Sequence, residues 1–131
     1  MKSRLVAASI ATFLFIGAGT GLASAHANLL RATIKNNEVF KVGHTPKVLQ
    51  GFFAQDLDSN PNRTWMAIFE GVADHGLVTE KQHSVVNFRN PKEMTVKLPR
   101  LAPDMYYIIW YTHSAVDGHY AAGIVYFSVK K

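Results

Sequence analysis

The fold is decided by one stretch near the C-terminus, residues 105–111, which reads MYYIIWY. Its residues are apolar at both odd and even positions. A strand over Tyr106–His113 is therefore predicted to be covered on both faces or to lie in the centre of its sheet. No window of about eleven residues after position 26 shows sustained helical spacing, so the chain around this stretch is predicted to be all-β.

Short apolar segments separated by turn-forming residues extend outward from this stretch. Turns are predicted at Asn36-Asn37, Ser59-Asn60-Pro61-Asn62, Asp74-His75-Gly76, Asn90-Pro91 and Ala102-Pro103-Asp104. About seven strands are predicted between them: Leu29–Ile34, Lys47–Ala54, Trp65–Gly71, His83–Phe88, Met94–Leu98, Tyr106–His113 and Ile124–Val129. In the last strand, Val125, Phe127 and Val129 should face inward. This pattern is typical of a Greek-key β-sandwich, cupredoxin-like or immunoglobulin-like.

Residues 1–25 have the three parts of a secretory signal peptide. Lys2 and Arg4 form the basic start, an apolar run extends from Leu5 to Leu22, and Ala23-Ser24-Ala25 is a small-residue cleavage site. An uncleaved membrane anchor is the alternative, since the run approaches the roughly 18–20 residues that span a bilayer. We expect cleavage after Ala25, a periplasmic location and one mature domain over residues 26–131.

The composition narrows the classes of partner and site. The chain has 14 Lys and Arg against 9 Asp and Glu, but they form no basic stripe with interleaved aromatic residues, so we expect no nucleic-acid partner. No apolar run follows the leader, so the mature protein is not expected to span a membrane. The absence of cysteine leaves nitrogen and oxygen as the donors for any metal.

His26 directly follows the predicted cleavage site, and at a mature N-terminus it would offer an α-amine and its imidazole Nδ1 to one ion. Asp117 and His119 share a face in an extended segment, and Gly118 lets the backbone approach closely. The alternative for this pair is an ordinary Asp-Gly turn beside a surface histidine. Together the residues give three nitrogens and one oxygen, which suits tetragonal Cu(II). Zinc, which prefers a tetrahedron, is the competitor.

Three segments carry a family resemblance. They are the start His-Ala-x-Leu at His26, the segment LPRLAPDMY over residues 98–106, and the ending Trp110…Ser114…Asp117-Gly118-His119…Gly123…Tyr126-Phe127-Ser128-Val129. The chain resembles the CopC/PcoC copper-resistance proteins. The resemblance implies a periplasmic cupredoxin-like sandwich that binds one Cu(II) ion through His26, Asp117 and His119. Such a protein acts as a copper carrier or buffer in copper resistance or homeostasis, with an inner-membrane copper transporter as a candidate partner.

One departure from the family pattern concerns the spacing before the Asp-Gly-His motif. Two residues, Ala115 and Val116, separate the serine from Asp117, where the family usually has one. We expect the additional residue to form a β-bulge.

The methionines and the other histidines are further candidate metal ligands, and most of them are predicted to have structural roles instead. Met66, Met94 and Met105 are dispersed along the chain, so they are predicted to fill the core rather than to bind Cu(I). His113 is either a donor near the metal or a partly buried strand histidine. His44, His75 and His83 are predicted to lie on the surface.

Two other functions remain open beside that of a binding protein without enzymatic activity. An N-terminal histidine that binds copper also resembles the site of lytic polysaccharide monooxygenases, with Tyr111, Tyr120 or Tyr126 as the axial aromatic residue. The third possibility is a sandwich domain for adhesion or assembly whose histidines are incidental. No His-Glu-x-x-His, Gly-x-Ser-x-Gly or phosphate-binding loop occurs in the sequence, so hydrolase functions have no support.

Overall fold

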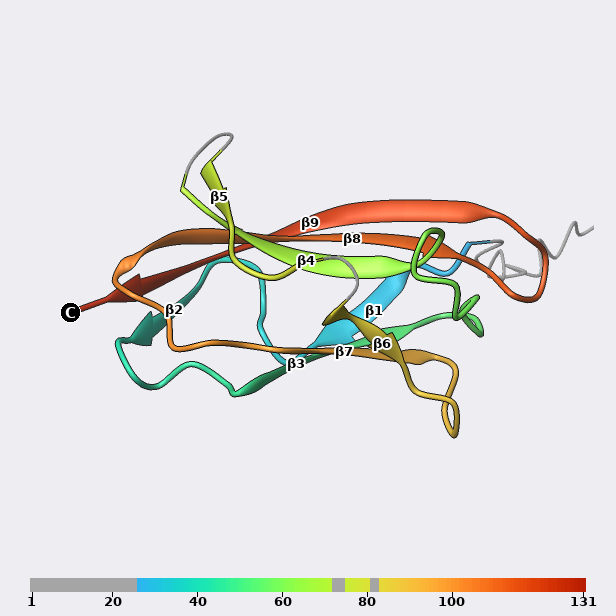
Figure 1. The fold of residues 1–131 in the computed structure, drawn as a ribbon, viewed down its shortest axis with the longest axis horizontal. Coiled ribbons are helices and arrows are strands. Elements are labelled where there is room, and N and C mark those ends of the chain that lie inside the picture. The colour runs from blue at the N-terminus through green and yellow to red at the C-terminus, as the bar shows by residue number, and fades with distance from the viewer. Residues whose placement is uncertain (1–25, 72–74, 81–82) are drawn as a thin grey trace, which may run out of the picture.

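The computed structural model describes residues 26–71, 75–80 and 83–131, and the predicted signal peptide lies outside these ranges. The described chain forms two β-sheets packed face to face (Figure 1). One sheet has the order β1-β3-β7-β6, formed by β1 (Leu29–Ala32), β3 (Val48–Phe53), β7 (Glu93–Lys97) and β6 (Val85–Val86). The other has the order β2-β9-β8-β4-β5, formed by β2 (Glu38–Lys41), β9 (Tyr120–Lys130), β8 (Asp104–His113), β4 (Trp65–Glu70) and β5 (His75–Leu77). The predicted all-β sandwich is confirmed.

Strand β8 contains the stretch that decided the fold, and it lies in the centre of the five-stranded sheet. It pairs antiparallel with β9 in unbroken register from Asp104↔Val129 to His113↔Tyr120, and with β4 on its other side. Its even-numbered residues from Tyr106 to Thr112 are buried between the sheets, whereas Tyr107, Ile109 and Tyr111 lie half-buried on the outer face. The strand was predicted either to be covered on both faces or to lie in the centre of its sheet, and the structure shows the second arrangement.

The structure adds two strands to the seven predicted. Strand β2 was missed because it is short and is stabilised by parallel pairing with β9, a contact that local sequence does not encode. Strand β5 was missed because His75-Gly76 resembles a turn, whereas these residues pair with β4. The predicted strand over 83–88 is reduced to Val85–Val86, and the last strand is longer than predicted.

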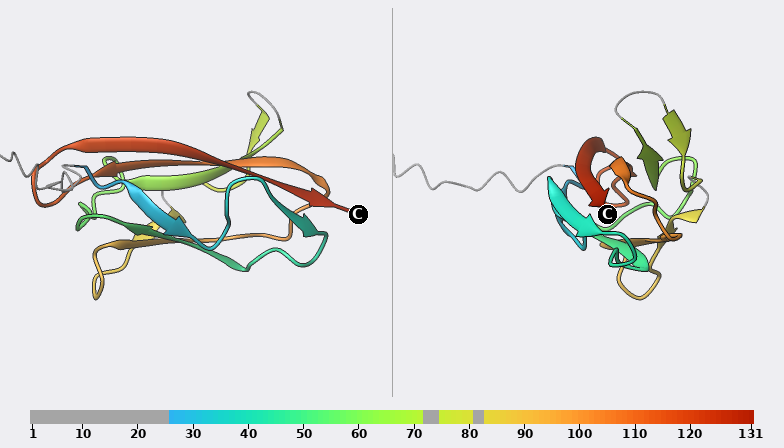
Figure 2. Two further views of the ribbon diagram at one scale, coloured as in Figure 1. Left: turned by 180° about the vertical axis from the view of Figure 1, so that it is seen from behind. Right: turned by 90° about the vertical axis from the view of Figure 1, so that its left-hand side faces the viewer.

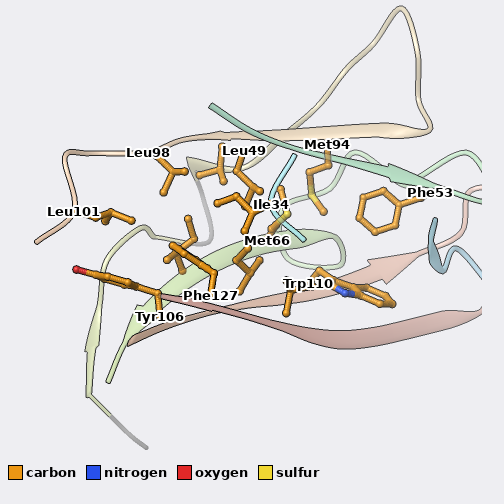
Figure 3. Packing of buried hydrophobic residues seen from close by; sticks show 14 of the residues in the cluster. Ile34, Leu49, Phe53, Met66, Met94, Leu98, Leu101, Tyr106, Trp110 and Phe127 are labelled. Carbon is orange, nitrogen blue, oxygen red and sulfur yellow. The ribbon is translucent and has the colours of Figure 1, made fainter. Parts of the chain in front are cut away.

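The core fills the space between the two sheets (Figure 3). Val125, Phe127 and Val129 are buried as predicted, and so are Met66 and Met94. The prediction for Met105 was wrong. This side chain is 49% exposed because it occupies an outward position at the start of β8.

Tyr106 closes one end of the core. Its hydroxyl donates a hydrogen bond of 2.7 Å to the Ala102 carbonyl, and burial raises the pKa of the phenol. Its ring stacks on Phe127 with centroids 5.3 Å apart. The bond fastens the loop before β8 to the strand itself, as in the tyrosine corner of other sandwiches.

The described chain starts at one end of the sandwich and finishes at the other. In Figure 2 the segment that leads into β1 lies beside the loop between β8 and β9, and the C-terminus lies at the opposite end. Across residues 26–71, 75–80 and 83–131, no helix is long and apolar enough to cross a membrane. Residues that are far apart in sequence, His26 and the Asp117-Gly118-His119 motif, therefore share one end of the molecule.

Candidate metal centre

The loop between β8 and β9 is a tight hairpin end that Ser114 holds in place. The Ser114 N–H donates to the His119 carbonyl at 2.9 Å, and the Gly118 N–H donates to the Ser114 carbonyl at 3.1 Å. The buried Ser114 hydroxyl accepts the N–H groups of Val116 and Asp117 at 3.1 and 3.3 Å. These bonds fix Asp117 and His119 relative to the strands.

The additional residue in the motif spacing does not form the predicted bulge. The register between β8 and β9 is unbroken up to the pair His113↔Tyr120. Both Ala115 and Val116 lie exposed in the hairpin loop, where Gly118 takes the left-handed conformation with φ of 74°. The loop absorbs the extra residue because its ends are closed by hydrogen bonds, so the strands need no irregularity.

Asp117 and His119 form a compact pair. The Asp117 carboxylate accepts the His119 N–H at 3.1 Å through Oδ1, and its Oδ2 lies 3.1 Å from His119 Nδ1. The backbone bond from His119 lowers the pKa of Asp117 well below its usual range, and bonds with the side chains of His119, Ser114 and Gln55 lower it further. The carboxylate is therefore ionised at any physiological pH.

His26 reaches the same end of the sandwich from the start of the described chain. Its ring lies edge-on to His119, with centroids 5.2 Å apart and an interplanar angle of 87°. The next residue, Ala27, is fully buried, and its carbonyl accepts a 2.7 Å bond from the Thr112 hydroxyl of β8. This buried bond places His26 beside the hairpin, so His26 contacts His119, which in turn pairs with Asp117.

Gln55 is a fourth polar residue at this end, and the sequence analysis missed it. Its Nε2 donates to Asp117 Oδ2 at 3.5 Å. Its Oε1 is buried without a hydrogen-bond partner, which is uncommon for a buried carbonyl oxygen. No motif spacing could have identified Gln55, because a lone glutamine after a strand is unremarkable in sequence.

His113 is the partly buried strand histidine of the second interpretation. Its Nδ1 lies 2.9 Å from Asp58 Oδ2, and its ring packs on Tyr120 with centroids 4.5 Å apart. Arg63 also contacts Asp58, at 3.4 Å. The backbone N–H of Asn60 lowers the pKa of Asp58, and His113 and Arg63 lower it further.

The other candidate residues considered above are two histidines and three tyrosines. His44 and His83 are exposed, as predicted. Tyr111, Tyr120 and Tyr126, considered above as axial aromatic residues, belong to the outer face of the five-stranded sheet. Tyr111 stacks on Trp65 and Tyr120, and Tyr126 packs on Tyr107 at an interplanar angle of 45°.

The donors at this end of the sandwich have the chemistry of a metal site. Imidazole nitrogens with one carboxylate suit copper and zinc, and Gln55 contacts that carboxylate through its Nε2. Within the described ranges, no group of three or more His, Cys, Asp or Glu side chains is close enough to hold an ion. In the full-length chain the nitrogen of His26 is also part of the peptide bond to Ala25. The chemistry of these donors suits copper or zinc, but the side chains of the described ranges do not by themselves form a complete ligand set.

Comparison with known proteins identifies the fold. No protein-family model and no curated protein sequence matches this chain. CopC from Methylosinus trichosporium OB3b is similar in structure, with a TM-score of 0.67 and 24% identity over 80% of this chain and 94% of that chain. PcoC, a methionine-rich copper resistance protein from Escherichia coli, has a TM-score of 0.60 and 23% identity over 80% of this chain and 99% of that chain. The chain therefore has the CopC-type, cupredoxin-like β-sandwich fold.

Proposed function

We propose that this protein is exported, loses residues 1–25, and binds one Cu(II) ion at the end of the sandwich that carries the β8–β9 hairpin. The observation that carries the proposal is the meeting of His26 with His119, whose rings lie 5.2 Å apart although they come from opposite ends of the mature chain. The description of PcoC as a copper resistance protein supports copper as the ion.

The residues would share the ion in distinct roles. His26 supplies a chelate through its new α-amine and Nδ1, and His119 supplies a second imidazole. Asp117 either binds the ion or orients His119, and its present contact with His119 Nδ1 at 3.1 Å supports the orienting role. The resulting nitrogen-rich set favours Cu(II), since copper has the highest affinity among the divalent ions for such donors.

The same geometry supports a carrier or buffer in the periplasm rather than an enzyme. The proposed donors lie on a short hairpin loop and a chain terminus, and a bound Asp117 would fill a position that oxygen chemistry needs open. We propose that the protein holds copper and passes it on, with an inner-membrane copper transporter as the candidate recipient.

Copper titration of the processed protein tests the site. The His26→Ala variant is expected to lose about 100-fold in Cu(II) affinity, because it lacks one imidazole and the chelate that this ring forms with the amine. His44→Ala, which removes an exposed histidine away from the hairpin, is the matched control and should bind like the wild type. Unchanged tight binding by His26→Ala would refute the chelate.

A further inference from the structure

The end of the sandwich opposite the β8–β9 hairpin concentrates positive charge. The C-terminal ends of β2 and β9 meet there, together with the loop between β2 and β3 and the segment between β7 and β8 (Figures 1 and 2). Six of the chain's 14 lysine and arginine residues belong to this end, which we call the basic end: Lys41, Lys47, Lys97, Arg100, Lys130 and Lys131. All six residues are exposed.

Backbone contacts hold these residues at one end of the molecule. Lys41 and Lys130 are direct partners in the parallel pairing of β2 with β9. The Lys47 carbonyl accepts the Leu98 N–H at 2.9 Å, which brings the segment after β7 beside the start of β3. Lys41 and Lys130 belong to the five-stranded sheet and Lys97 to the four-stranded sheet, so the positive charge extends across both layers of the sandwich.

Carboxylates of the described chain do not neutralise this charge. Three acidic residues occur in the same part of the fold, Glu38 in β2, Glu70 at the end of β4 and Asp104 at the start of β8. Across the described ranges, no ion pair of 4.0 Å or less joins any of them to a residue of the basic end. Glu38 and Asp104 instead accept backbone N–H groups, each at 2.7 Å. The basic end therefore presents an excess of positive charge to the solvent.

A hollow of about 430 Å³ lies within the basic end, between residues 43–47 and residues 98–100. The side chains of Lys47 and Arg100 line it together with Thr45, and its lining contains no carboxylate. A phosphate group in this hollow would meet two cations and a hydroxyl, which are the groups that bind phosphate oxygens in proteins. The hollow therefore has the chemistry to receive a phosphate group.

We propose that the basic end binds the surface of a lipid bilayer that carries anionic phospholipids. Its cations extend over both sheets, which lie about 10 Å apart, so they match an extended array of headgroups better than a single anion. Five of the six are lysines. Lysine acts as a flexible point charge suited to mobile headgroups, whereas the recognition of fixed carboxylates in a protein partner favours the planar guanidinium of arginine.

This orientation leaves the proposed copper site facing away from the bilayer. His26 and the Asp117-Gly118-His119 motif lie at the end of the sandwich opposite to the C-terminus (Figure 2). Membrane binding and copper binding therefore use separate surfaces, so each can be tested without the other.

Co-sedimentation of the processed, metal-free protein with phospholipid vesicles tests the membrane contact. The wild type should bind vesicles of phosphatidylcholine with about 30% phosphatidylglycerol at about 50 mM salt and be released at about 500 mM, where screening is stronger. It should not bind vesicles of phosphatidylcholine alone. Lys47→Glu/Arg100→Glu should weaken binding at least about 20-fold, because each cation near an anionic surface contributes roughly a factor of five.

Arg89→Glu/Lys92→Glu is the matched control, because it makes the same change in net charge at exposed positions of the loop beside the opposite end. This control should bind nearly as well as the wild type. Lys41→Glu/Lys130→Glu provides a second variant of the basic end if the first does not fold, with circular dichroism as the check on folding.

A wild type that does not bind the anionic vesicles would overturn the proposal, and binding of that protein to polyglutamate would assign the basic end to an acidic protein. Equal losses in the basic-end variant and the control would also overturn it, because the net charge of the protein would then explain the binding.

Discussion

Gln55 is the residue whose role the fold alone does not explain. A buried oxygen without a partner costs about 1–3 kcal/mol, yet Gln55 keeps its Oε1 in this state while its Nε2 contacts Asp117. Leucine would fill the same space without the cost. Gln55 thus keeps an amide next to Asp117, a residue of the proposed copper site, at a cost to the stability of the domain.

Replacement of Gln55 should therefore change the stability of the metal-free protein and its copper affinity in opposite directions. Gln55→Leu is expected to stabilise the metal-free protein by about 1 kcal/mol, because the unpaired oxygen is removed, and to lower copper affinity about tenfold. Thermal unfolding and copper titration measure the two effects. Gln50→Leu, which breaks a 3.1 Å bond to Glu93 in β7, is the control and should leave copper affinity unchanged. If Gln55→Leu is less stable than the wild type and binds copper normally, then Gln55 contributes to the stability of the fold and not to copper binding.

Asp58 gives a prediction for pH. Its pKa is lowered in the folded protein, so its contribution to stability is fully present above its unfolded value of about 3.9 and is lost as pH falls through the folded value. Asp58→Asn should lower the melting temperature at pH 7, and the difference from wild type should shrink below about pH 4. Melting curves from pH 7 to 2 measure this. A difference that stays constant down to pH 2 would show that the ionised carboxylate is not responsible.

At the level of elements, the β8–β9 hairpin positions the proposed site, and two of its glycines are required for different reasons. Gly118 has a positive φ of 74°, and a Cβ there would only touch His113 Nε2 at 3.8 Å, whereas a Cβ at Gly123 would collide with the indole ring of Trp110. Position 118 needs glycine because the backbone there has a positive φ. Position 123 needs glycine because there is no room for a side chain.

Alanine at these two positions should distinguish the reasons. Gly118→Ala is expected to cost about 1 kcal/mol through backbone strain, and Gly123→Ala about 1–3 kcal/mol through displacement of Trp110. Gly118→Asn should recover part of the loss because asparagine tolerates a positive φ, while no larger residue should rescue position 123. Denaturant unfolding measures each value, and equal losses for Gly118→Ala and Gly118→Asn would contradict the backbone explanation.

The same elements show what sequence could predict. Strand β8 and the alternation in β9 were evident, because a long apolar run and a period of two are local patterns. Strand β2 depends on a parallel partner at the far end of the chain, so no local pattern could indicate it. Asp117 and His119 were identified by their spacing, and His26 by its position after the predicted signal peptide. The contacts of Gln55 with Asp117 and of Asp58 with His113 exist only after folding.

At the level of the whole molecule, the proposed copper site depends on where the mature chain begins. An added residue before His26 would convert the α-amine into a peptide nitrogen and leave all side chains in place. The processed protein extended by one glycine is therefore expected to lose about 100-fold in Cu(II) affinity with an unchanged melting temperature. Intact mass confirms each terminus, and copper titration compares the two proteins. Equal affinities would show that the amine is not a ligand.

The buried bond between Thr112 and Ala27 also has a consequence for the proposed removal of residues 1–25. Ala27 is only two residues beyond the bond between Ala25 and His26, and its carbonyl is held by a strand from the last quarter of the chain. A peptidase needs an extended, accessible stretch on both sides of the bond that it cuts. If residues 1–25 are removed as proposed, the cut should come before this segment docks, because after docking the peptidase would meet a shielded substrate.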